Sequence, residues 1–439
     1  MGLRELLQSW LLPQEVWHKM QEVTQQRDYR IGKQKRQLKM VPFQPDDNIV
    51  MNFTGLVIDR SVSMLFGKGI DTQFDTETAQ EYIDMVLEAN RQELFLHNMG
   101  LTGGEAGTFY VKIVPDGVVY KGVVYPRLVV LDPMLITIVT EPNDKEKVTA
   151  YHIVYVVKED GKETVRQEVT RKDNETWVIE YGIIENDKFK IEKTTNWEYD
   201  FPPIIHGQNL PNIESPYGDP DVTEDVVELQ DRLNLTSSNI SKILRLHAHP
   251  ILVGVGMSGG NNSAVDIEPG KMVKVGADQD VHAVEMQSDL MSSQQYLMTM
   301  RQALFDVTRT VDISSMSDKL GALTNFGLKV LYQDAIAKNN TKQALYGEVL
   351  EELFRRLLIL NNMPEEHGVI IWPDVLPSDD KQDMEALKAE MELGLVSKET
   401  ASTERGRDFE QESEKIAGEK SQGDNIGEMI LQNFNRNNV

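Results

Sequence analysis

Apolar positions repeat at helical spacing in two central stretches of the chain, one on each side of a strand-like insert. In the first stretch, residues three and four apart give one apolar face: Val222, Val226, Leu229, Leu233, Ile240 and Ile243. An N-cap residue followed by proline, Asp219–Pro220, predicts the helix start, and Asp221, Glu224 and Asp225 favour a first turn there. His249–Pro250 predicts its end, for a helix of roughly 40 Å.

The second stretch, from about 288 to 310, predicts a returning helix. Its apolar seam lies near the heptad period: Leu290, Leu297, Met300, Leu304, Val307 and Val311. Its other faces are polar: Ser292, Ser293, Gln294, Gln295, Thr299 and Thr308. An antiparallel helical hairpin in a core would explain both stretches. The insert at 250–287, however, alternates like short strands and turns and is longer than an ordinary helix connection, so it predicts a small β module at the tip of the two helices.

The N-terminal hundred residues predict three helical regions. Residues 1–40 are expected to form a helical lead-in, whose basic residues form either a solvated helix face or a polyanion contact: Arg27, Arg30, Lys33, Lys35, Arg36 and Lys39. Helical spacing also predicts helices over 49–66 and 76–98. A glycine cluster follows and indicates a loop: Gly100, Gly103, Gly104 and Gly107.

The next hundred residues change to period-two alternation with turn signals. This pattern, at about 108–200, predicts an antiparallel meander of six or seven strands. After the second central helix comes the polar stretch VDISSMSDKLGALTNFG, and then one helix of more than thirty residues is expected from Leu328 onward. HGVIIWPDVLP predicts a last strand. From Ser378 the chain is acidic and helix-prone, and it ends in a Gly/Asn-rich tail.

Composition and charge narrow the class of protein. The chain has 439 residues, with 45 Lys and Arg against 70 Asp and Glu, so its formal charge is −25. A surface of that charge repels nucleic acid, which argues against high-affinity DNA binding. The chain has no cysteine, which fits a reducing compartment. No signal-peptide layout opens the sequence and no apolar run reaches ~18 residues, so a soluble cytosolic product is expected.

The motifs of enzyme chemistry are missing from the sequence. FGKGID, around Lys68, has neither the upstream glycine nor the Ser/Thr of a phosphate loop, so its glycines are expected to end a helix. His247 and His249 lie at a predicted helix end without neighbouring ligands at metal-binding spacing. HExxH does not occur, and the one GxSxG match, at 256–260, lies in the Gly-rich insert. We therefore predict a protein that is not an enzyme and has no catalytic, cofactor-binding or metal-binding residues.

The order of these parts resembles the portal (head-to-tail connector) proteins of tailed double-stranded DNA bacteriophages, in the siphophage branch. Three segments carry the resemblance: NLPNIESPYGDPDVTEDVVELQDRLNLTSSNISK at 209–242, the stretch from LMTMRQ to LLIL at 297–360, and LGLVSKETASTE at 393–404. Where many relatives have Ser-Gly-x-Ala-Leu, this chain has Asn325-Phe326-Gly327-Leu328.

The resemblance implies an α+β portal fold with a wing of helices and antiparallel sheet, a two-helix stem, a small β-containing clip and a helical crown. Its implied parts are the first part of the wing (1–220), stem helix 1 (221–247), the clip (248–287), stem helix 2 (288–310), the tunnel loop (311–322), the long wing helix with the final strand (323–377), and the crown with a flexible tail (378–439).

The resemblance also implies a structural ring, commonly of twelve subunits, at one capsid vertex of the virion, assembled in the host cytoplasm. It would form the channel for genome packaging and ejection, through which double-stranded DNA passes without sequence-specific contacts. The implied partners are the terminase large subunit, the major capsid or scaffolding protein and a neck adaptor; no membrane is implied. Two alternatives stay open: another phage neck or connector protein, and an enzyme with an atypical site.

Two sets of site residues follow from the resemblance. The clip would dock partners through Met257, Asn261, Asn262, Lys271 and Lys274. The tunnel loop would line the channel with Asp312, Ser314, Ser315, Ser317 and Lys319. Lys319 is the candidate for a cation that reaches DNA in a mostly acidic lumen. The alternative is that Lys319 pairs with Asp318 or Asp312 on an exposed loop.

Overall fold

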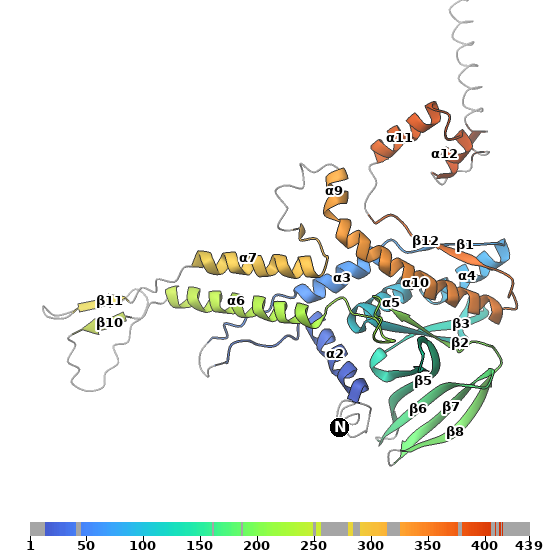
Figure 1. Cartoon of the computed structure of the whole chain (residues 1–439), viewed down its shortest axis with the longest axis horizontal. Coiled ribbons are helices and arrows are strands. Elements are labelled where there is room, and N and C mark those ends of the chain that lie inside the picture. Colours follow the sequence, from blue (N-terminus) through green and yellow to red (C-terminus); the bar gives the residue numbers. More distant parts are fainter. Residues whose placement is uncertain are drawn as a thin grey trace, which may run out of the picture. The chain divides into compact units, whose positions relative to one another are not determined.

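The computed structural model describes residues 14–40, 45–159, 162–185, 188–248, 252–255, 280–283, 290–313, 325–375 and 380–404, and the single positions 409, 412, 413 and 415. The chain divides into two compact units, Met1–Val375 and Leu376–Val439. The first combines helices with antiparallel sheets, so the predicted α+β class is confirmed (Figure 1). In the second unit the structure describes α11 (Asp380–Glu392) and α12 (Lys398–Glu404).

The predicted meander of 108–200 forms seven strands, as expected, but they divide between two sheets. The last five build one sheet in sequence order: β4 (Ile136–Glu141), β5 (Asp144–Glu159), β6 (Lys162–Asp173), β7 (Thr176–Glu185) and β8 (Lys188–Trp197). The other sheet has the order β3-β2-β9: β3 (Val123–Leu131), β2 (Thr108–Tyr120) and β9 (Ile204–Gln208). The predicted final strand is β12 (Gly368–Ile371), which pairs with the unforeseen β1 (Asp71–Phe74).

Alternation along β2 places apolar side chains on both faces of the three-stranded sheet. Phe109, Val111 and Ile113 belong to a core with α4, α5 and α10, whereas Tyr110 joins a core with the five-stranded sheet, as period-two geometry requires. The wall of helices on the first face consists of α4 (Glu77–Ala89), α5 (Gln92–Ala106) and α10 (Gln333–Leu360). A third core joins α3 (Phe53–Phe66) and the residue Tyr29 of α2 (Gln14–Arg30) to the central helical hairpin.

The single helix predicted over 76–98 is wrong, because two helices, α4 and α5, meet there. Arg91 adopts φ 56, the left-handed region, and breaks the helical path between them. The Asn90 side chain just before the break accepts a hydrogen bond from the Leu128 N–H at 2.8 Å and donates one to the Pro126 carbonyl at 2.9 Å. Contacts with β3, distant in sequence, therefore compensate for the break.

The glycine cluster predicted as a loop is helical instead. Gly100, Gly103 and Gly104 lie inside α5, and Gly107 ends the helix with φ 75. A Cβ on Gly103 would lie 2.0 Å from the Tyr346 hydroxyl, and one on Gly104 would lie 2.8 Å from the Asp221 carboxylate. The glycines are there because α10 and the segment before the hairpin approach α5 closely. Close packing has overridden the low helix propensity of glycine.

Two other predicted helices differ in extent. The helical lead-in ends at Arg30, and residues 31–40 are not helical. The helix predicted from Leu328 divides at Tyr332 into α9 (Asn325–Leu331) and the 28-residue α10. Two residues of the predicted basic face are paired within the chain: Arg27 contacts Glu105 at 3.1 Å and Asp132 at 2.8 Å, and Arg30 contacts Glu105 at 3.2 Å.

Candidate functional site at the base of the helical hairpin

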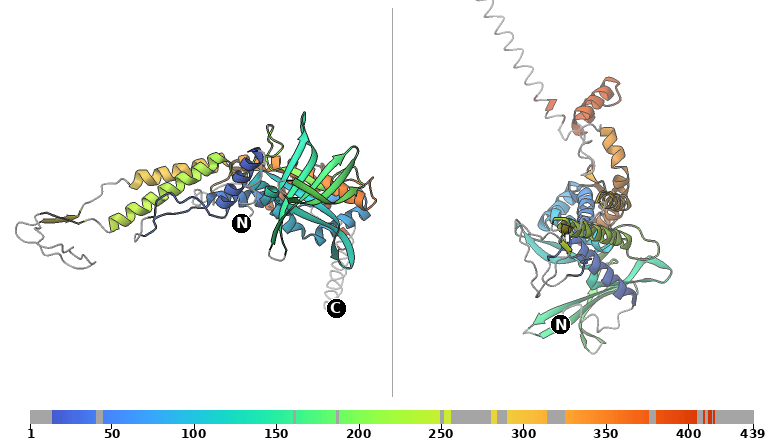
Figure 2. Two further views of the ribbon diagram at one scale, coloured as in Figure 1. Left: turned by 90° about the horizontal axis from the view of Figure 1, so that it is seen from below. Right: turned by 90° about the vertical axis from the view of Figure 1, so that its left-hand side faces the viewer.

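Two helices, α6 (Glu224–Ala248) and α7 (Leu290–Val307), form the predicted hairpin and lie side by side (Figures 1 and 2). The start predicted for α6 at Asp219–Pro220 is wrong, because those residues form an irregular segment held by the Asn209 side chain, whose amide donates to the Asp219 carbonyl at 3.1 Å. The predicted seam of α7 is wrong at Val307, which is 49% exposed, while the neighbouring Phe305 is buried.

Polar side chains on α6 hold the segment 49–53, which leads into α3 and includes its first residue. The backbone N–H groups of Ile49, Met51 and Phe53 donate to the side chains of Ser238, Asn234 and Gln230 at 2.9, 2.9 and 3.2 Å. Every second residue of the segment thus meets every fourth residue of the helix.

The polar stripe on α6 is buried and continues beyond these three contacts. Gln230, Asn234 and Ser238 are each at most 1% exposed, and the Asn234 amide also donates to the Gln34 side chain at 2.6 Å. Farther along α6, Arg245 binds the Asp47 carboxylate with two nitrogens, at 2.8 and 2.6 Å, and holds the pKa of Asp47 below its ordinary value. This polar face of α6 is therefore occupied by its own chain.

Three cationic side chains hold the residues that follow α7 in the chain. The Lys338 ammonium donates to the Thr308 carbonyl at 3.2 Å, and the Arg60 guanidinium donates to the Val311 carbonyl at 2.7 Å. Arg301 pairs with Asp312 at 2.7 Å. The Arg301 guanidinium also lies over the Phe53 ring at 5.3 Å and over the Phe305 ring at 5.8 Å. Thr308, predicted on a polar face of the helix, is instead buried.

A buried ionic cluster lies directly below the start of α6. Both Asp221 oxygens meet lysines of α10: Lys342 at 2.6 Å and Lys338 at 2.9 Å. Lys342 also donates to the Ser61 hydroxyl at 2.8 Å, and the Asp221 N–H donates to the Gly104 carbonyl at 2.9 Å. The cluster therefore joins α10, α3 and α5 to the beginning of the hairpin.

The charges of the cluster alter its acid–base behaviour. Burial lowers the pKa of Lys342 to about 8, although the attraction of Asp221 opposes the change. Burial alone would raise the pKa of Asp221, but the two lysines outweigh it and hold that pKa below its ordinary value. Asp221 is thus a carboxylate at neutral pH. Its two lysines give the site more positive than negative charge.

Of the residues predicted for the tunnel loop, the structure describes Asp312, which contacts Arg301 at the base of the hairpin. Ser314, Ser315, Ser317 and Lys319 lie outside the described residues. So do the predicted clip residues Met257, Asn261, Asn262, Lys271 and Lys274. Within the insert, β10 (Leu252–Val255) and β11 (Asp280–Ala283) pair as antiparallel strands, so the described part of the insert has the β structure that its alternation predicts.

The residues that fix the base of the hairpin were not foreseen as a site. The sequence predicts Asp221 only as an acidic residue of a helix's first turn, and Lys338 and Lys342 belong to a helix more than a hundred residues later. A weak sequence signal existed for the stripe, because Gln230, Asn234 and Ser238 recur every four residues on a face beside the apolar one. The contact partners of that stripe could not be read from spacing.

Within the described ranges, no group of three or more His, Cys, Asp or Glu side chains is arranged to hold a metal ion. No helix among the described residues is both long enough and apolar enough to span a membrane. The arrangement at the hairpin base positions the surrounding helices and the loop that follows α7.

Helices and antiparallel sheets carry a two-helix hairpin, and strands β10 and β11 pair within its insert. Residues 12–425 match the family described as phage portal protein, SPP1 Gp6-like. The chain therefore belongs to this family of phage portal proteins, and its role is a structural one in a virion-type particle. The predicted family, the portal fold and the absence of enzymatic function are confirmed, and the two alternatives are set aside.

Similar solved structures come from gene transfer agent particles. A chain from "Virion of native gene transfer agent (GTA) particle" is 12% identical with a TM-score of 0.45, over 88% of this chain and 99% of that chain. A chain from "Neck of empty GTA particle computed with C6 symmetry" is 13% identical with a TM-score of 0.45, over 81% and 89%. One from "Neck of native GTA particle computed with C12 symmetry" is 13% identical with a TM-score of 0.44, over 80% and 89%. No curated protein matches the sequence.

Proposed function

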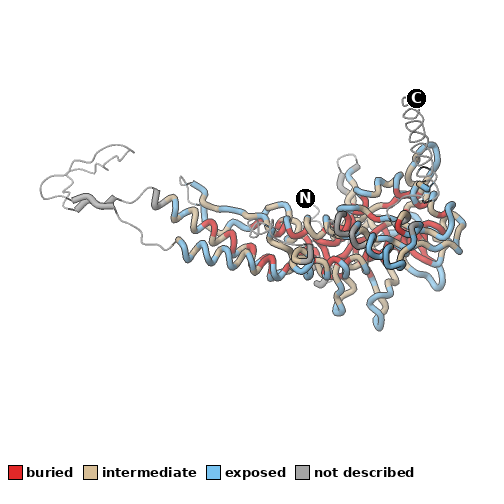
Figure 3. Tube along the Cα trace, turned by 90° about the horizontal axis from the view of Figure 1, so that it is seen from above, coloured by how far each residue is buried: buried red, intermediate tan, exposed pale blue. Residues whose placement is uncertain are grey.

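We propose that this portal protein forms a ring of twelve copies at one capsid vertex, and that DNA enters and leaves the particle through its channel. The observation that carries the ring is the apolar surface left on the hairpin. Met291 is 79% exposed, Met298 65%, Tyr296 48%, and Leu244 of α6 51% (Figure 3 shows exposed and intermediate residues toward the outer ends of both helices). Side chains of this kind are stabilised when neighbouring copies cover them.

Charge supports a channel that DNA passes without binding tightly. Twelve copies at −25 each give a formal charge of roughly −300. Duplex DNA carries about one charge per 1.7 Å, and a basic lumen would hold it by counterion release. We infer a mostly acidic lumen in which the segment after α7 reaches the DNA. The Arg301–Asp312 pair would fix where that segment leaves the helix.

Electron microscopy of the purified protein tests the ring. We expect ring-shaped particles with a central hole wide enough for duplex DNA, and light scattering at many times the ~50 kDa of one chain. A stable monomer at every concentration, with no rings in micrographs, would contradict the proposal. The number of subunits follows from rotational symmetry in the same images.

We assign the docking and channel roles to the wing, stem, clip and crown that the resemblance implies. The clip would contact the terminase large subunit during packaging and the neck adaptor afterwards, while the wing would contact capsid or scaffolding protein. Shortening the chain between Gly256 and Lys274 should preserve rings and abolish terminase binding; unchanged binding would show the clip assignment to be wrong. Lys319→Glu should assemble normally and alter packaging or retention of DNA, and wild-type efficiency would remove Lys319 from the channel.

A further inference from the structure

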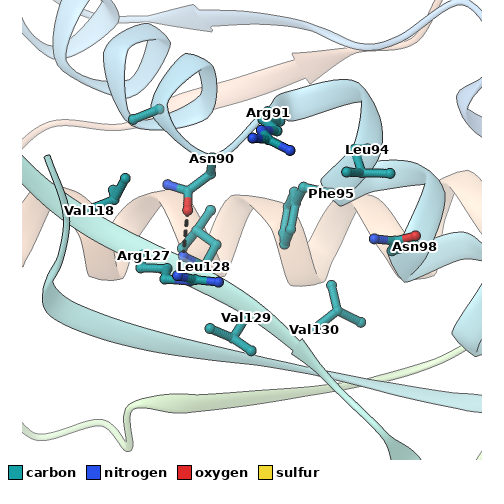
Figure 4. Close-up of a pocket in the computed structure, with 11 residues that line it drawn as sticks. Asn90, Arg91, Leu94, Phe95, Asn98, Val118, Arg127, Leu128, Val129 and Val130 are labelled. Carbon is teal, nitrogen blue, oxygen red and sulfur yellow. Dashed lines mark hydrogen bonds between the residues drawn. The ribbon is translucent and has the colours of Figure 1, made fainter. Parts of the chain in front are cut away.

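A groove runs between helix α5 and strand β3, away from the hairpin. Two cavities of about 430 and 340 Å³ follow one another along it and share Asn98 and Val130 as lining residues. The helix lines the groove with one face, at three- and four-residue steps: Arg91, Leu94, Phe95, Asn98, Leu101 and Thr102. The strand lines it from Arg127 to Asp132. Figure 4 shows the first cavity, with Leu94 and Phe95 facing the strand residues across it.

Strand β3 has a free edge along this groove, because the sheet order is β3-β2-β9. The Ile113 N–H on β2 donates toward β9, to the Pro203 carbonyl at 2.7 Å. Hydrogen-bonding direction alternates along an antiparallel strand, so Val111 also points toward β9. The residues of β3 opposite these two are Leu128 and Val130, whose backbone groups therefore point away from β2 and into the groove.

Asn90 already imitates the first contact of an added strand. Its side-chain amide bonds both the Leu128 N–H and the Pro126 carbonyl, the outward groups at one end of the edge. Figure 4 shows the bond with Leu128. Beyond Asn90 the next outward pair, the N–H and C=O of Val130, faces the groove. An edge with such groups directed outward is a template for another extended chain.

One end of the groove is positively charged and favours a ligand with a negative charge there. Arg91 and Arg127 lie at one end of it, and in the part of the chain that the structure describes neither forms an ion pair or a side-chain hydrogen bond. Unpaired guanidinium groups are conspicuous in a chain with 70 acidic and 45 basic residues. At the other end Arg27 is already paired with Asp132 and Glu105. Between the ends the surface is apolar, with Leu94 50% exposed.

We propose that this groove binds an extended segment of another protein, added to β3 as a further strand, with a carboxylate placed beside Arg91 and Arg127. The helix face from Arg91 to Thr102 is about 16 Å long, which accommodates about five extended residues. Main-chain hydrogen bonds to Val130 would give affinity, and an apolar side chain over the exposed Leu94, together with the carboxylate, would give specificity. This inference does not depend on the proposed ring or its channel.

Fluorescence anisotropy with the full chain tests the proposal. The probes are two fluorescein-labelled hexapeptides, Glu-Val-Thr-Val-Thr-Val and its reversed sequence, because the groove does not fix strand direction. At least one should bind saturably, and the same peptide N-methylated at alternate residues should bind at least about tenfold more weakly, since it cannot pair with the edge. Failure of both peptides to bind, or equal binding of the N-methylated form, would overturn the proposal.

Charge-reversal variants show whether the two arginines of the groove contact the peptide or only change the overall charge of the protein. Arg91→Glu combined with Arg127→Glu should weaken binding about tenfold, a change of about 1.4 kcal/mol, and a peptide with Lys in place of Glu should regain it. The matched control is Arg309→Glu, which reverses another exposed arginine without a described ion pair, outside the groove, and should leave binding unchanged. Equal losses from both variants would contradict the site.

The same measurement distinguishes other occupants. If the peptide binds only after rings are dissociated, a second copy of this chain fills the groove. If it binds only after removal of residues 1–13, the chain's own N-terminal segment fills it. Either result would overturn the assignment to another protein.

Discussion

The hairpin buries polar side chains toward its base and exposes apolar side chains in the outer half of α7. At the base, Gln230, Asn234 and Ser238 are buried, and each has a hydrogen-bonding partner in its own chain. In the outer half of α7, Met291 and Met298 are more than half exposed. Burial here follows the available partner rather than the polarity of the residue. The base is completed within one chain, and we infer that the outer half is completed between chains.

Removing the carboxylate at the base should have the largest effect. Asp221→Asn leaves the ammonium groups of Lys338 and Lys342 buried without a counterion, and breaking a buried pair in this way costs about 3–5 kcal/mol. Urea denaturation should show that loss in the free energy of unfolding.

The matched control is Glu228→Gln, the same chemical change at an exposed position of α6, which should alter stability by no more than about 0.5 kcal/mol. Comparable losses in the two variants would mean that the buried cluster contributes nothing special to the base.

The polar stripe should give the next largest effect. Asn234→Ala removes the acceptor of the Met51 N–H and the donor to Gln34, and leaves both groups buried, so the free energy of unfolding should fall by about 2 kcal/mol. Asn239→Ala, on the exposed side of the same helix, is the control and should be nearly neutral. A neutral Asn234→Ala would show that segment 49–53 does not depend on the stripe.

The sequence predicted elements well where a local period decides them, and poorly where distant contacts do. The two hairpin helices, six or seven strands between about 108 and 200, and the final strand were predicted from the sequence pattern. The meander's division into two sheets was not, because β2 pairs with β9, nearly a hundred residues away. The α5 glycines were misread for the same reason: what they accommodate, Tyr346 and Asp221, is distant in sequence.

The candidate site shows the same limit more sharply. Asp221 looked like an ordinary first-turn acid, because dipole and capping preferences are local. Its actual role depends on two lysines of α10 that only the fold brings close. The portal resemblance predicted the hairpin and its β insert, but no sequence pattern showed that α6 would use one polar face to hold residues 49–53.

The buried lysine makes the base sensitive to pH. The pKa of Lys342 falls from an ordinary 10.5 to about 8 in the folded chain, so between those values the unfolded chain binds more protons. The free energy of unfolding should therefore rise as pH increases above about 8, by about 1–2 kcal/mol at pH 9.5. Thermal or urea unfolding at pH 7–9.5 measures this rise in the free energy of unfolding. Lys342→Met should lose this rise; an unchanged slope would exclude Lys342 as its source.

Changes in the outer half of the hairpin should hardly affect the isolated subunit and should act on assembly. Met291→Ser with Met298→Ser replaces two side chains that are 79% and 65% exposed, so the free energy of unfolding of the isolated subunit should change by no more than about 0.5 kcal/mol. If neighbouring copies cover these positions, each copy loses apolar burial at an interface repeated around the ring, and rings should become rare at concentrations where the unaltered chain forms them. Sedimentation velocity of both proteins measures this, with Gln302→Ser, exposed on the same helix, as the control. Rings in normal yield would mean that this face of α7 stays in solvent, and the contrast between base and outer half would then need another cause.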